Sequence, residues 1–448
     1  MNKDQLIAKS EIPAKKALAM HPFYKGKLQV TPRCRIEDFQ DFGIWYSPGV
    51  AAPCMDIAKN PERVYEHTSK WNYVAVVSDG TRVLGLGDIG PEAGLPVMEG
   101  KALLYKYLGG VDAFPMCIGP DMSAEQIIQL VKWIQPTFGG INLEDISKPK
   151  CFKVLDTLRK DPDVHIPVWH DDQQGTACVT LAGMLNAVKV VGKKKKDVRI
   201  VFNGVGAANF AISRLLHSSG FDTNKAIFVD SKGILYKERE DLLSPENYKY
   251  EIANHSNPEQ MRGDCGIAMD GADVLISLSK SGPGIIKPEW VSHMAKDPIV
   301  FACANPVPEI FPWDAKEAGA VIVATGRSDF PNQVNNSIGF PGIFRGTLDV
   351  RATTITDEMV IAAAEELAMY AENKGLRHDY IVPTMDDMQV FIEEAVAVGQ
   401  KAIEQNVARI RLSPDEAREI ATKLITDSQG QTKLLMEKGY IPEYPDKL

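Results

Sequence analysis

The sequence predicts an α/β protein whose second half forms a parallel, doubly wound sheet and whose last part is helical. Five short apolar runs, each typical of a buried strand, alternate there with helical stretches: VRIVFNG, KAIFVD, DVLISLS, PIVFACANP and AVIVATG. Such alternation indicates a parallel sheet with helices on both faces. From Thr356 onward the apolar residues have helical spacing, and Ser413 and Pro414 are typical of an N-cap and a first helical residue.

The composition is that of a soluble globular protein with room for two or three domains. The 448 residues are 24% charged and 44% hydrophobic, and the net charge of -9 disfavours nucleic acid or an anionic membrane as a partner. No run of apolar residues is long enough to span a membrane, and the N-terminal MNKDQLIAKSEIPAKKALAM lacks the apolar segment of a signal peptide. The seven scattered cysteines favour free thiols and a cytoplasmic location.

One lysine of the first half stands on an apolar helix face. The stretch after Pro96 predicts a short helix that ends at Gly109 and Gly110. The neighbours of Lys101 three and four positions away are all apolar or aromatic: Val97, Met98, Leu104 and Tyr105. Because a lysine normally faces water, we expect a specific role for this one.

Two pairs of adjacent carboxylates follow strand-like runs. Glu144 and Asp145 come after INL, and Asp171 and Asp172 come after IPVWH. Like charges at strand ends repel each other unless a cation or solvent screens them, so both pairs could converge on Mg²⁺ or Mn²⁺. The alternative is that both pairs are helix caps and solvated turn charges. For His170 we expect packing or support of the ligands rather than direct metal binding.

A glycine-rich turn joins the first strand of the second half to a helix. The turn is that of a dinucleotide-binding fingerprint, with Asn209 in place of its third glycine; its residues are Gly204, Val205, Gly206 and Ala207. The next strand ends at Asp230, whose carboxylate can accept the ribose hydroxyls of NAD. Ser231 and Lys232 follow and could instead hold the 2′-phosphate of NADP, which we slightly favour, although Lys232 could also be an exposed turn lysine. The alternative to dinucleotide binding is an ordinary strand-helix turn.

Tyr46 precedes a tight turn formed by Ser47, Pro48 and Gly49. A tyrosine held by a rigid turn can be a positioned general acid, or its hydroxyl can simply bond to the backbone. Taken alone, this motif favours the structural interpretation.

Eight blocks now occur in order: YSPGVAAPC, SDGTRVLGLGDIG, LPVMEGKALLYK, INLEDI, HDDQQGTA, FNGVGAAN, ANPVPEI and NNSIGFPG. Together they resemble malic enzymes of the short, bacterial type, over roughly residues 11–351. The resemblance implies oxidative decarboxylation of L-malate to pyruvate and CO₂ with reduction of NAD or NADP. Asn209 departs from the dinucleotide motif, and the stretch after Ser413 matches no block, so its role stays open.

The resemblance also implies catalytic roles. Lys101 matches the family's catalytic lysine, and its apolar surroundings would lower its pKa toward that of a base for the C2 hydroxyl. Tyr46 would protonate C3 of enolpyruvate, and Asp171 would orient Lys101 or the metal shell.

The remaining site residues implied by the resemblance bind ligands. Glu144, Asp145 and Asp172 would hold the Mg²⁺ or Mn²⁺ ion. Arg82, with Asn305 and Asn336, would bind substrate carboxylate and nicotinamide-ribose oxygens.

We expect three segments: a substrate and metal domain (residues 1–174), a Rossmann-like NAD(P)-binding domain (175–352) and a C-terminal helical segment (353–448) that packs back on the first domain. The family suggests a homodimer or a higher homo-oligomer. The alternatives are a 2-hydroxyacid dehydrogenase that releases no CO₂, an oxaloacetate decarboxylase that uses no dinucleotide, and a nucleotide-sensing module.

Overall fold

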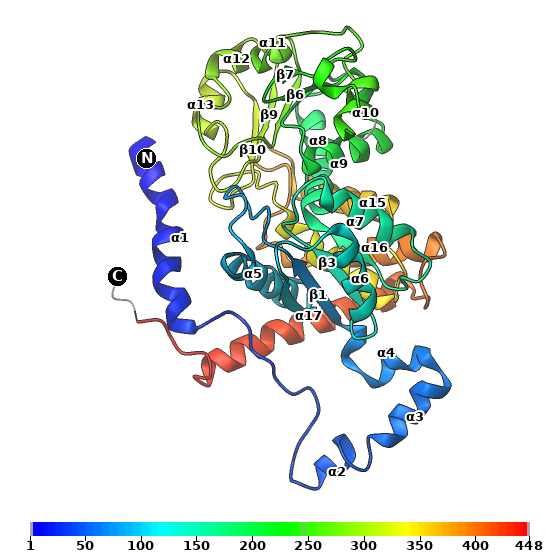
Figure 1. Ribbon diagram of the computed structural model, residues 1–448. Helices are drawn as coiled ribbons and strands as arrows, with labels where there is room; N and C mark the ends of the chain where they lie inside the picture. The colour runs from blue at the N-terminus through cyan, green and yellow to red at the C-terminus, as the bar shows by residue number, and fades with distance from the viewer. Residues whose placement is uncertain (1–2, 245–246, 446–448) are drawn as a thin grey trace.

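The computed structural model describes residues 3–244 and 247–445 of the chain. Two sheets stand one above the other in Figure 1, with helices around each. The first has the strand order β2-β1-β3-β4 and the second the order β10-β9-β8-β5-β6-β7. The expected α/β class with a Rossmann-like second sheet is confirmed.

The first sheet is entirely parallel. Its strands are β1 (Tyr73–Ser78), β2 (Asp112–Cys117), β3 (Gly140–Leu143) and β4 (Val168–His170). Alternate residues of β1 enter different cores: Val74 and Val76 pack with α5 (Pro91–Gly109), whereas Ala75 and Val77 pack with α6 (Ala124–Ile134) and α7 (Lys150–Lys160). Burial of both faces explains why β1 is almost continuously apolar.

Helix α5 differs from its prediction at one end. It starts at Pro91, after Gly90 with φ 82°, and Pro96 lies inside it. Proline suits the first helical position because its φ is already helical and its missing N–H would have no partner there. The end is as predicted, with Gly110 in the left-handed conformation at φ 62°.

The second sheet is parallel except for its edge strand β7, which runs antiparallel to β6. Its strands are β5 (Ile200–Asn203), β6 (Ile227–Asp230), β7 (Gly233–Ile234), β8 (Val274–Ser277), β9 (Ile299–Ala302) and β10 (Ile322–Thr325). One face packs on α8 (Thr176–Val190) and α9 (Ala207–Ser218). The other packs on short helices: α11 (Cys265–Met269), α12 (Pro288–Ser292) and α13 (Pro312–Glu317). Helix α10 (Tyr248–Asn254) follows β7.

Four helices complete the body: α14 (Phe340–Asp349), α15 (Asp357–Lys374), α16 (Met388–Glu404) and α17 (Pro414–Glu437). Helix α15 packs on α8, and α16 packs on α14. Ser413 caps α17 through a reciprocal capping box with Glu416. The stretch of unknown role after Ser413 is therefore mainly this helix, which lies against α5, where Ser428 donates to the carbonyl of Lys106 (2.7 Å).

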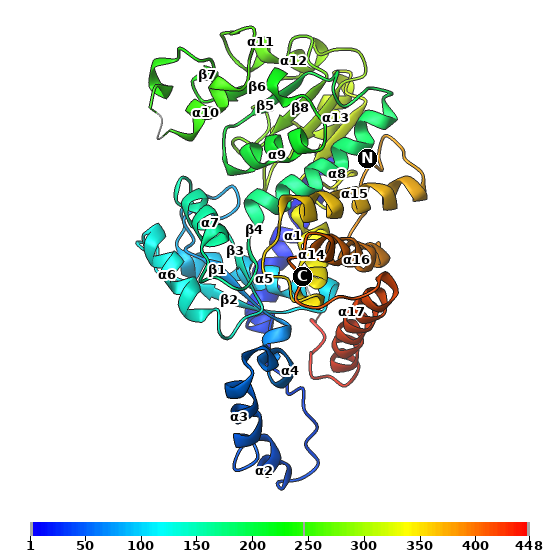
Figure 2. The same cartoon turned by 90° about the vertical axis from the view of Figure 1, so that its right-hand side faces the viewer.

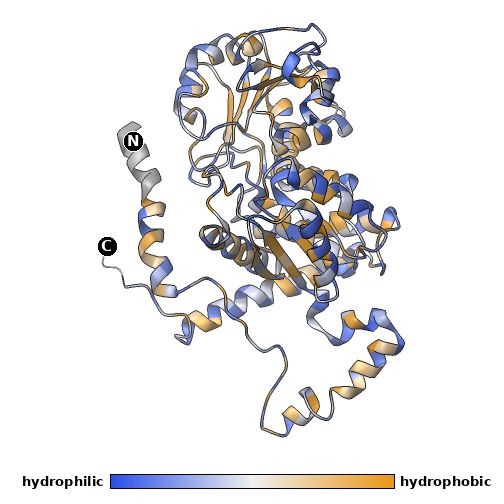
Figure 3. Ribbon diagram, in the orientation of Figure 1, coloured by the Kyte–Doolittle hydropathy of each residue, from blue (hydrophilic) through white to orange (hydrophobic). Residues whose placement is uncertain are grey.

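The chain before β1 contains α1 (Lys3–Tyr24), α2 (Asp41–Trp45), α3 (Ala51–Lys59) and α4 (Val64–His67). The part that contains α2 and α3 extends away from both sheets (Figures 1 and 2), whereas Lys27 and Arg33 contact the first domain at Pro96 and Asp112. We call residues 36–59 the arm. Apolar residues are scattered along it in Figure 3, and several large ones are exposed: Ile36, Phe39, Phe42, Ile44, Trp45 and Met55.

None of the described helices is both long and apolar enough to cross a membrane. All seven cysteines are free thiols, as the sequence predicts.

Candidate active site

Lys101 lies in the interior of the first domain. Its side chain is 7% exposed and forms ion pairs with Asp171 and with Oε1 of Glu144 (3.0 Å). Its ammonium also lies 4.3 Å from the centre of the Phe340 ring. The ammonium of Lys101, which projects from the apolar face of its helix, therefore contacts two buried carboxylates and an aromatic ring.

The expected lowering of the Lys101 pKa is wrong. Burial alone would lower it, but the charges of Asp171 and Glu144 raise the pKa of Lys101 above its ordinary value. Both carboxylates are far from Lys101 in the sequence. The spacing of residues along its helix therefore indicates its apolar neighbours but not the two acidic partners.

A buried hydrogen-bond chain leads from the same helix to Glu144. Tyr105, one turn after Lys101, donates to Oδ1 of Asn142 (2.8 Å), and Asn142 donates to Oε2 of Glu144 (2.8 Å). Sequence reasoning missed both residues, because Tyr105 was read only as an apolar neighbour. Its spacing from Lys101 was the available signal.

The carboxylates of the two pairs gather where β3 and β4 end. These strands are neighbours in register, with Leu143 opposite His170, so the residues that follow them lie at one edge of the sheet. We call this group the acidic edge: Glu144, Asp145, Asp171 and Asp172. One ligand atom each from Glu144, Asp145 and Asp172 lie within 4.8 Å of one another.

The acidic edge has the properties of a cation site. Burial raises the pKa of Glu144 well above its usual value and that of Asp145 to about 8, and the charge of Asp172 adds to both. Oδ2 of Asp145 is buried and has no hydrogen-bond partner among the described residues. Three converging oxygen donors, whose charge Lys101 and Arg82 compensate only in part, fit a hard divalent ion such as Mg²⁺ or Mn²⁺.

Asp171 and His170 differ from these three. Asp171 accepts from the indole N–H of Trp169 (2.9 Å) and pairs with Lys101, so its two oxygens are already engaged. A Cβ on Gly175 would lie 2.0 Å from Oδ1 of Asp171, so the turn Asp171–Gly175 needs a glycine there. His170 is fully buried, with Nδ1 3.8 Å from Oδ2 of Asp172. Burial lowers the pKa of His170, which keeps the ring neutral.

Arg82 and Asn336 lie beside the acidic edge. The backbone N–H of Arg82 donates to the carbonyl of Asp145 (3.0 Å), and its exposed guanidinium contributes to lowering the Asp145 pKa. Asn336 is in the short helix Asn336–Ile338, and a Cβ on Gly175 would lie 3.1 Å from its own Cβ. The structure thus brings both residues to the neighbourhood of Asp171 and Asp145.

Asn305 belongs to the loop after β9. A Cβ on Gly326 would lie 2.8 Å from its Nδ2, and a Cβ on Gly85 would lie 1.9 Å from its carbonyl oxygen. The loop of the first domain that carries Gly85 therefore touches the second domain directly.

Tyr46 is not brought to this site within one chain. It lies in the arm between α2 and α3, is 74% exposed, and the arm stands apart from α5 in both views (Figures 1 and 2). Its backbone closes the expected turn, accepting from the N–H of Val50 (3.0 Å).

The glycine-rich turn has the geometry that a dinucleotide needs. Gly204 has φ +96°, and a Cβ there would lie 2.4 Å from the carbonyl of Leu278. Gly206 precedes α9 and has open space around it, so a ligand can approach the backbone. Asn209 donates to the carbonyls of Asn203 and Gly204 (3.1 and 2.7 Å), so it ties the turn to the helix.

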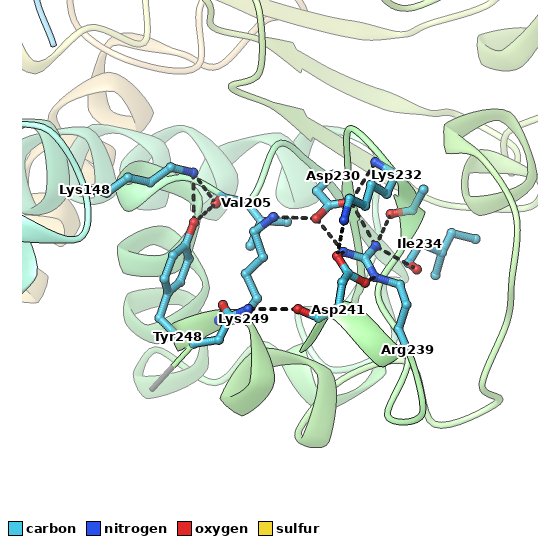
Figure 4. Close-up of polar contacts among 11 residues, drawn as sticks. Lys148, Val205, Asp230, Lys232, Ile234, Arg239, Asp241, Tyr248 and Lys249 are labelled. Carbon is cyan, nitrogen blue, oxygen red and sulfur yellow. Dashed lines mark hydrogen bonds and ion pairs between the residues drawn. The ribbon is translucent and has the colours of Figure 1, made fainter. Parts of the chain in front are cut away.

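Asp230 lies in a group of alternating charges at the end of β6 (Figure 4). This charged cluster consists of Asp230, Lys232, Arg239, Asp241 and Lys249. Burial alone would raise the pKa of Asp230, but hydrogen bonds from Arg239 and Lys249 lower it to about 2. The cluster borders a cavity of about 690 Å³ that Ser231 also lines. The sequence analysis missed Arg239 and Lys249, because both lie outside the glycine-rich motif and the Asp230–Lys232 segment, although their side chains contact Asp230.

Two sequence models of one family match the chain. "Malic enzyme, N-terminal domain" matches residues 25–159, and "Malic enzyme, NAD binding domain" matches residues 173–403.

The curated relatives of this chain are named as malic enzymes. The chain is 48% identical to the "Bifunctional malic/malolactic enzyme" of Bacillus subtilis, over 91% of this chain and 97% of that protein. It is 48% identical to the "NAD-dependent malic enzyme" of Geobacillus stearothermophilus, over 86% of this chain and 78% of that protein. The "NADP-dependent malic enzyme" of Escherichia coli is 41% identical over 88% of this chain, which spans 52% of that relative's length.

Crystal structures of malic enzymes are similar to this chain over most of its length. The malic enzyme of Entamoeba histolytica superposes with a TM-score of 0.96 at 48% identity, over 99% of this chain and 93% of that one. The malic enzyme of Pyrococcus horikoshii gives a TM-score of 0.87 at 47% identity, over 95% and 98% of the two chains.

Proposed function

The chain belongs to the malic enzyme family, and from this premise we propose how its residues divide the reaction. It is an oxidoreductase that decarboxylates malate oxidatively and uses a nicotinamide dinucleotide. A dehydrogenase that releases no CO₂ and a decarboxylase without a dinucleotide are not favoured by these relatives. The observation that carries the proposal is Lys101, buried between Asp171 and Glu144 at the acidic edge.

Glu144, Asp145 and Asp172 would hold one Mg²⁺ or Mn²⁺ ion. Support comes from their converging oxygens and from the raised pKa of the Asp145 carboxyl. Such an ion, when bound, acts as a Lewis acid on the substrate oxygens and stabilises the negative charge that develops on loss of CO₂. Asn142 would keep Glu144 in its ligating orientation through the hydrogen bond to Oε2.

Lys101 and Asp171 would move the proton of the C2 hydroxyl as a pair. The ion pair between them gives the proton a short path from Nζ to a carboxylate. Because Lys101 forms an ion pair with Asp171, it can pass a proton to that carboxylate and then accept the hydroxyl proton. Trp169 donates to the other oxygen of Asp171 and so fixes which oxygen faces Lys101.

Arg82, Asn305 and Asn336 would bind the substrate carboxylates and the nicotinamide ribose. Arg82 and Asn336 flank the acidic edge, and Asn305 comes from the second domain. In the proposed division into residues 1–174, 175–352 and 353–448, the site therefore lies where the first two domains meet. Their contact at Gly85 would help to exclude water from it.

Tyr46 would protonate C3 of enolpyruvate in the site of a second copy of this chain. The tyrosine is exposed on an arm that stands apart from its own Lys101, and large apolar side chains are exposed along that arm. Exposed apolar surface of this kind is typical of an interface between subunits. We therefore propose a homodimer, or a higher homo-oligomer, in which the arms are exchanged.

Co-expression of two inactive variants tests this exchange. In a mixed dimer of Lys101→Ala and Tyr46→Phe chains, exchanged arms leave one site with both wild-type residues, so activity returns. If each chain supplies its own tyrosine, both sites of the mixed dimer are defective and activity stays lost. The two homodimers, assayed separately, serve as controls.

For the cofactor, NADP would be slightly preferred to NAD. The charged cluster contains three cations, Lys232, Arg239 and Lys249, against two carboxylates, Asp230 and Asp241. The surplus cation would favour a 2′-phosphate at the ribose.

The reaction itself is tested by incubation with L-malate, Mn²⁺ and either NAD or NADP while reduced cofactor and CO₂ are both measured. We expect the two products in equal amounts. Reduced cofactor without CO₂ would indicate a simple dehydrogenase, and CO₂ from oxaloacetate alone would indicate a decarboxylase.

A further inference from the structure

Lys148 reaches from the first domain to the dinucleotide turn of the second (Figure 4). It follows β3, directly after the INLEDIS segment, and precedes α7. Its ammonium donates to the carbonyl of Val205 (2.9 Å) and to the hydroxyl of Tyr248 (2.8 Å). Val205 is the residue between the two glycines of the turn, so Lys148 lies at the place where the backbone approaches the cofactor.

The contact between the domains is built around this lysine. Tyr248 also donates to the carbonyl of Val205 (2.6 Å), which closes a triangle of three polar groups. Next to it, the ring of Phe152 from α7 packs against Phe210 from α9 (5.7 Å) and against Tyr248 (5.2 Å). The position of Lys148 is therefore set by packing on both sides of the domain boundary.

The charge of Lys148 has no carboxylate partner among the described residues. Two lysines that follow it closely are paired: Lys150 with Asp79, and Lys153 with Glu125. Burial, with the nearby charge of Arg82, lowers the pKa of Lys148. A cation close to the N-terminal end of a helix also opposes the helix dipole, so this arrangement becomes favourable when an anion binds between them.

We propose that Lys148 binds the diphosphate of the nicotinamide dinucleotide and thereby fastens the first domain to the cofactor held by the second. The proposal rests on the proposed function, because it needs a dinucleotide on the Gly204–Gly206 turn. Two of the three ammonium protons already serve Val205 and Tyr248, and the third is free for a phosphate oxygen. Lys148 is thus a binding and positioning residue that the sequence motifs did not include.

Direct binding of cofactor fragments tests this role without turnover. Calorimetry would measure the Kd of ADP, which carries the diphosphate, and of adenosine, which does not, in the absence of malate and divalent ions. We expect Lys148→Met to weaken ADP binding about tenfold, or about 1.4 kcal/mol, and to leave adenosine unchanged. Lys148→Arg, which keeps the charge, should retain most of the ADP affinity.

Two further variants separate charge from structure. Lys153→Met removes an exposed lysine of the same segment and should leave both affinities unchanged. Tyr248→Phe removes a hydroxyl that holds Val205 but no charge, so its effect on ADP should be much smaller than that of Lys148→Met. The salt dependence of ADP binding should decrease in Lys148→Met alone. If that variant does not fold, Lys148→Gln replaces it.

Equal losses for ADP in Lys148→Met and Tyr248→Phe would mean that Lys148 only holds the turn, and the proposal would be wrong. It would also be wrong if Lys148→Met left ADP binding unchanged in a protein whose wild type binds ADP and oxidises malate. A wild-type protein that binds neither NAD nor NADP would instead overturn the proposed function.

Discussion

Two carboxylate-rich regions of this protein have opposite electrostatics. At the acidic edge, Asp145 is buried with other carboxylates, and its pKa is raised to about 8. In the charged cluster, Asp230 is held by Arg239 and Lys249, and its pKa is lowered to about 2. Both regions follow the ends of parallel strands, so their position in the fold does not explain the difference.

The difference lies in which cations the chain supplies. The charged cluster contains its own counter-charges, whereas among the described residues the acidic edge has only Lys101 and the exposed Arg82 for four carboxylates. Carboxylates that a protein leaves uncompensated in its interior indicate a missing positive partner, which here fits a divalent ion. An acidic cluster is thus evidence of a metal site only after the chain's own cations have been counted.

The largest expected effect comes from removal of one carboxylate of the acidic edge. Asp172→Ala should lower Mn²⁺-dependent kcat/KM by at least about 100-fold, because three protein ligands become two. Asp241→Ala, which removes a carboxylate from the charged cluster, is the matched control and should keep Mn²⁺ dependence unchanged. Comparable losses in the two variants would remove the distinction between the regions.

Lys101, which pairs with Glu144 and Asp171 at the acidic edge, gives the next largest effect. Lys101→Ala should lower kcat by roughly 10²–10⁴, the usual range for a positioned acid-base group. A small amine added to the assay should restore part of the rate by entering the cavity left by the side chain. A variant with normal kcat and raised Mn²⁺ requirement would show that Lys101 only balances charge.

The pH dependence of stability should also distinguish the two regions. A carboxyl whose pKa is about 8 when folded binds more protons in the folded state, so Asp145 makes stability fall as pH rises from about 4 to 8. Mn²⁺ should therefore raise the melting temperature of metal-free protein more at pH 8 than at pH 6. Asp145→Asn should reduce this difference, and Glu144, whose pKa is also raised, should account for what remains.

Asp230 should contribute no slope in that interval. Its lowered pKa stabilises the fold above about pH 4, and this contribution is lost only as the pH falls toward 2. Asp230→Asn, as the control, should keep the pH 6 to 8 response of the wild type. A response that vanished in Asp230→Asn and persisted in Asp145→Asn would contradict the assignment.

The smallest effect is expected at the rim of the charged cluster. Lys232 is 65% exposed and pairs with Asp241 at 3.0 Å, so its contribution is that of a surface charge. Lys232→Ala should raise the KM for NADP about two- to fivefold and leave the KM for NAD nearly unchanged. Equal changes for both cofactors would remove the reason to prefer NADP.

Local patterns predicted much of this molecule. Five of the six strands of the second sheet, the Ser413 cap and the glycine-rich turn could be recognised because each depends on residues close together in sequence, whereas the two-residue edge strand β7 was too short to predict. The convergence of Glu144 and Asp172 could be proposed because parallel strands end at a common edge. That β3 and β4 are neighbours, however, is decided by packing and not by either strand alone.

Interactions between distant residues could not be predicted in the same way. The Lys101 pKa was misjudged because its partners Asp171 and Glu144 come from the ends of β4 and β3. The sequence predicts that α5 starts after Pro96, because proline is typical of a helix boundary. In the structure Pro96 lies inside α5, where its missing N–H removes one backbone hydrogen bond of the helix. The sequence of the turn at Tyr46 does not indicate that this residue lies far from Lys101 of the same chain.

The pairing of β3 with β4 also affects how the chain folds. Before these strands dock, Glu144 and Asp172 are separated by a long flexible segment and repel each other little. Docking brings the carboxylates together, so closing this edge of the sheet must proceed against their mutual repulsion. A divalent ion present during refolding would lower that barrier, and the ion proposed for catalysis would then also speed the assembly of its own site.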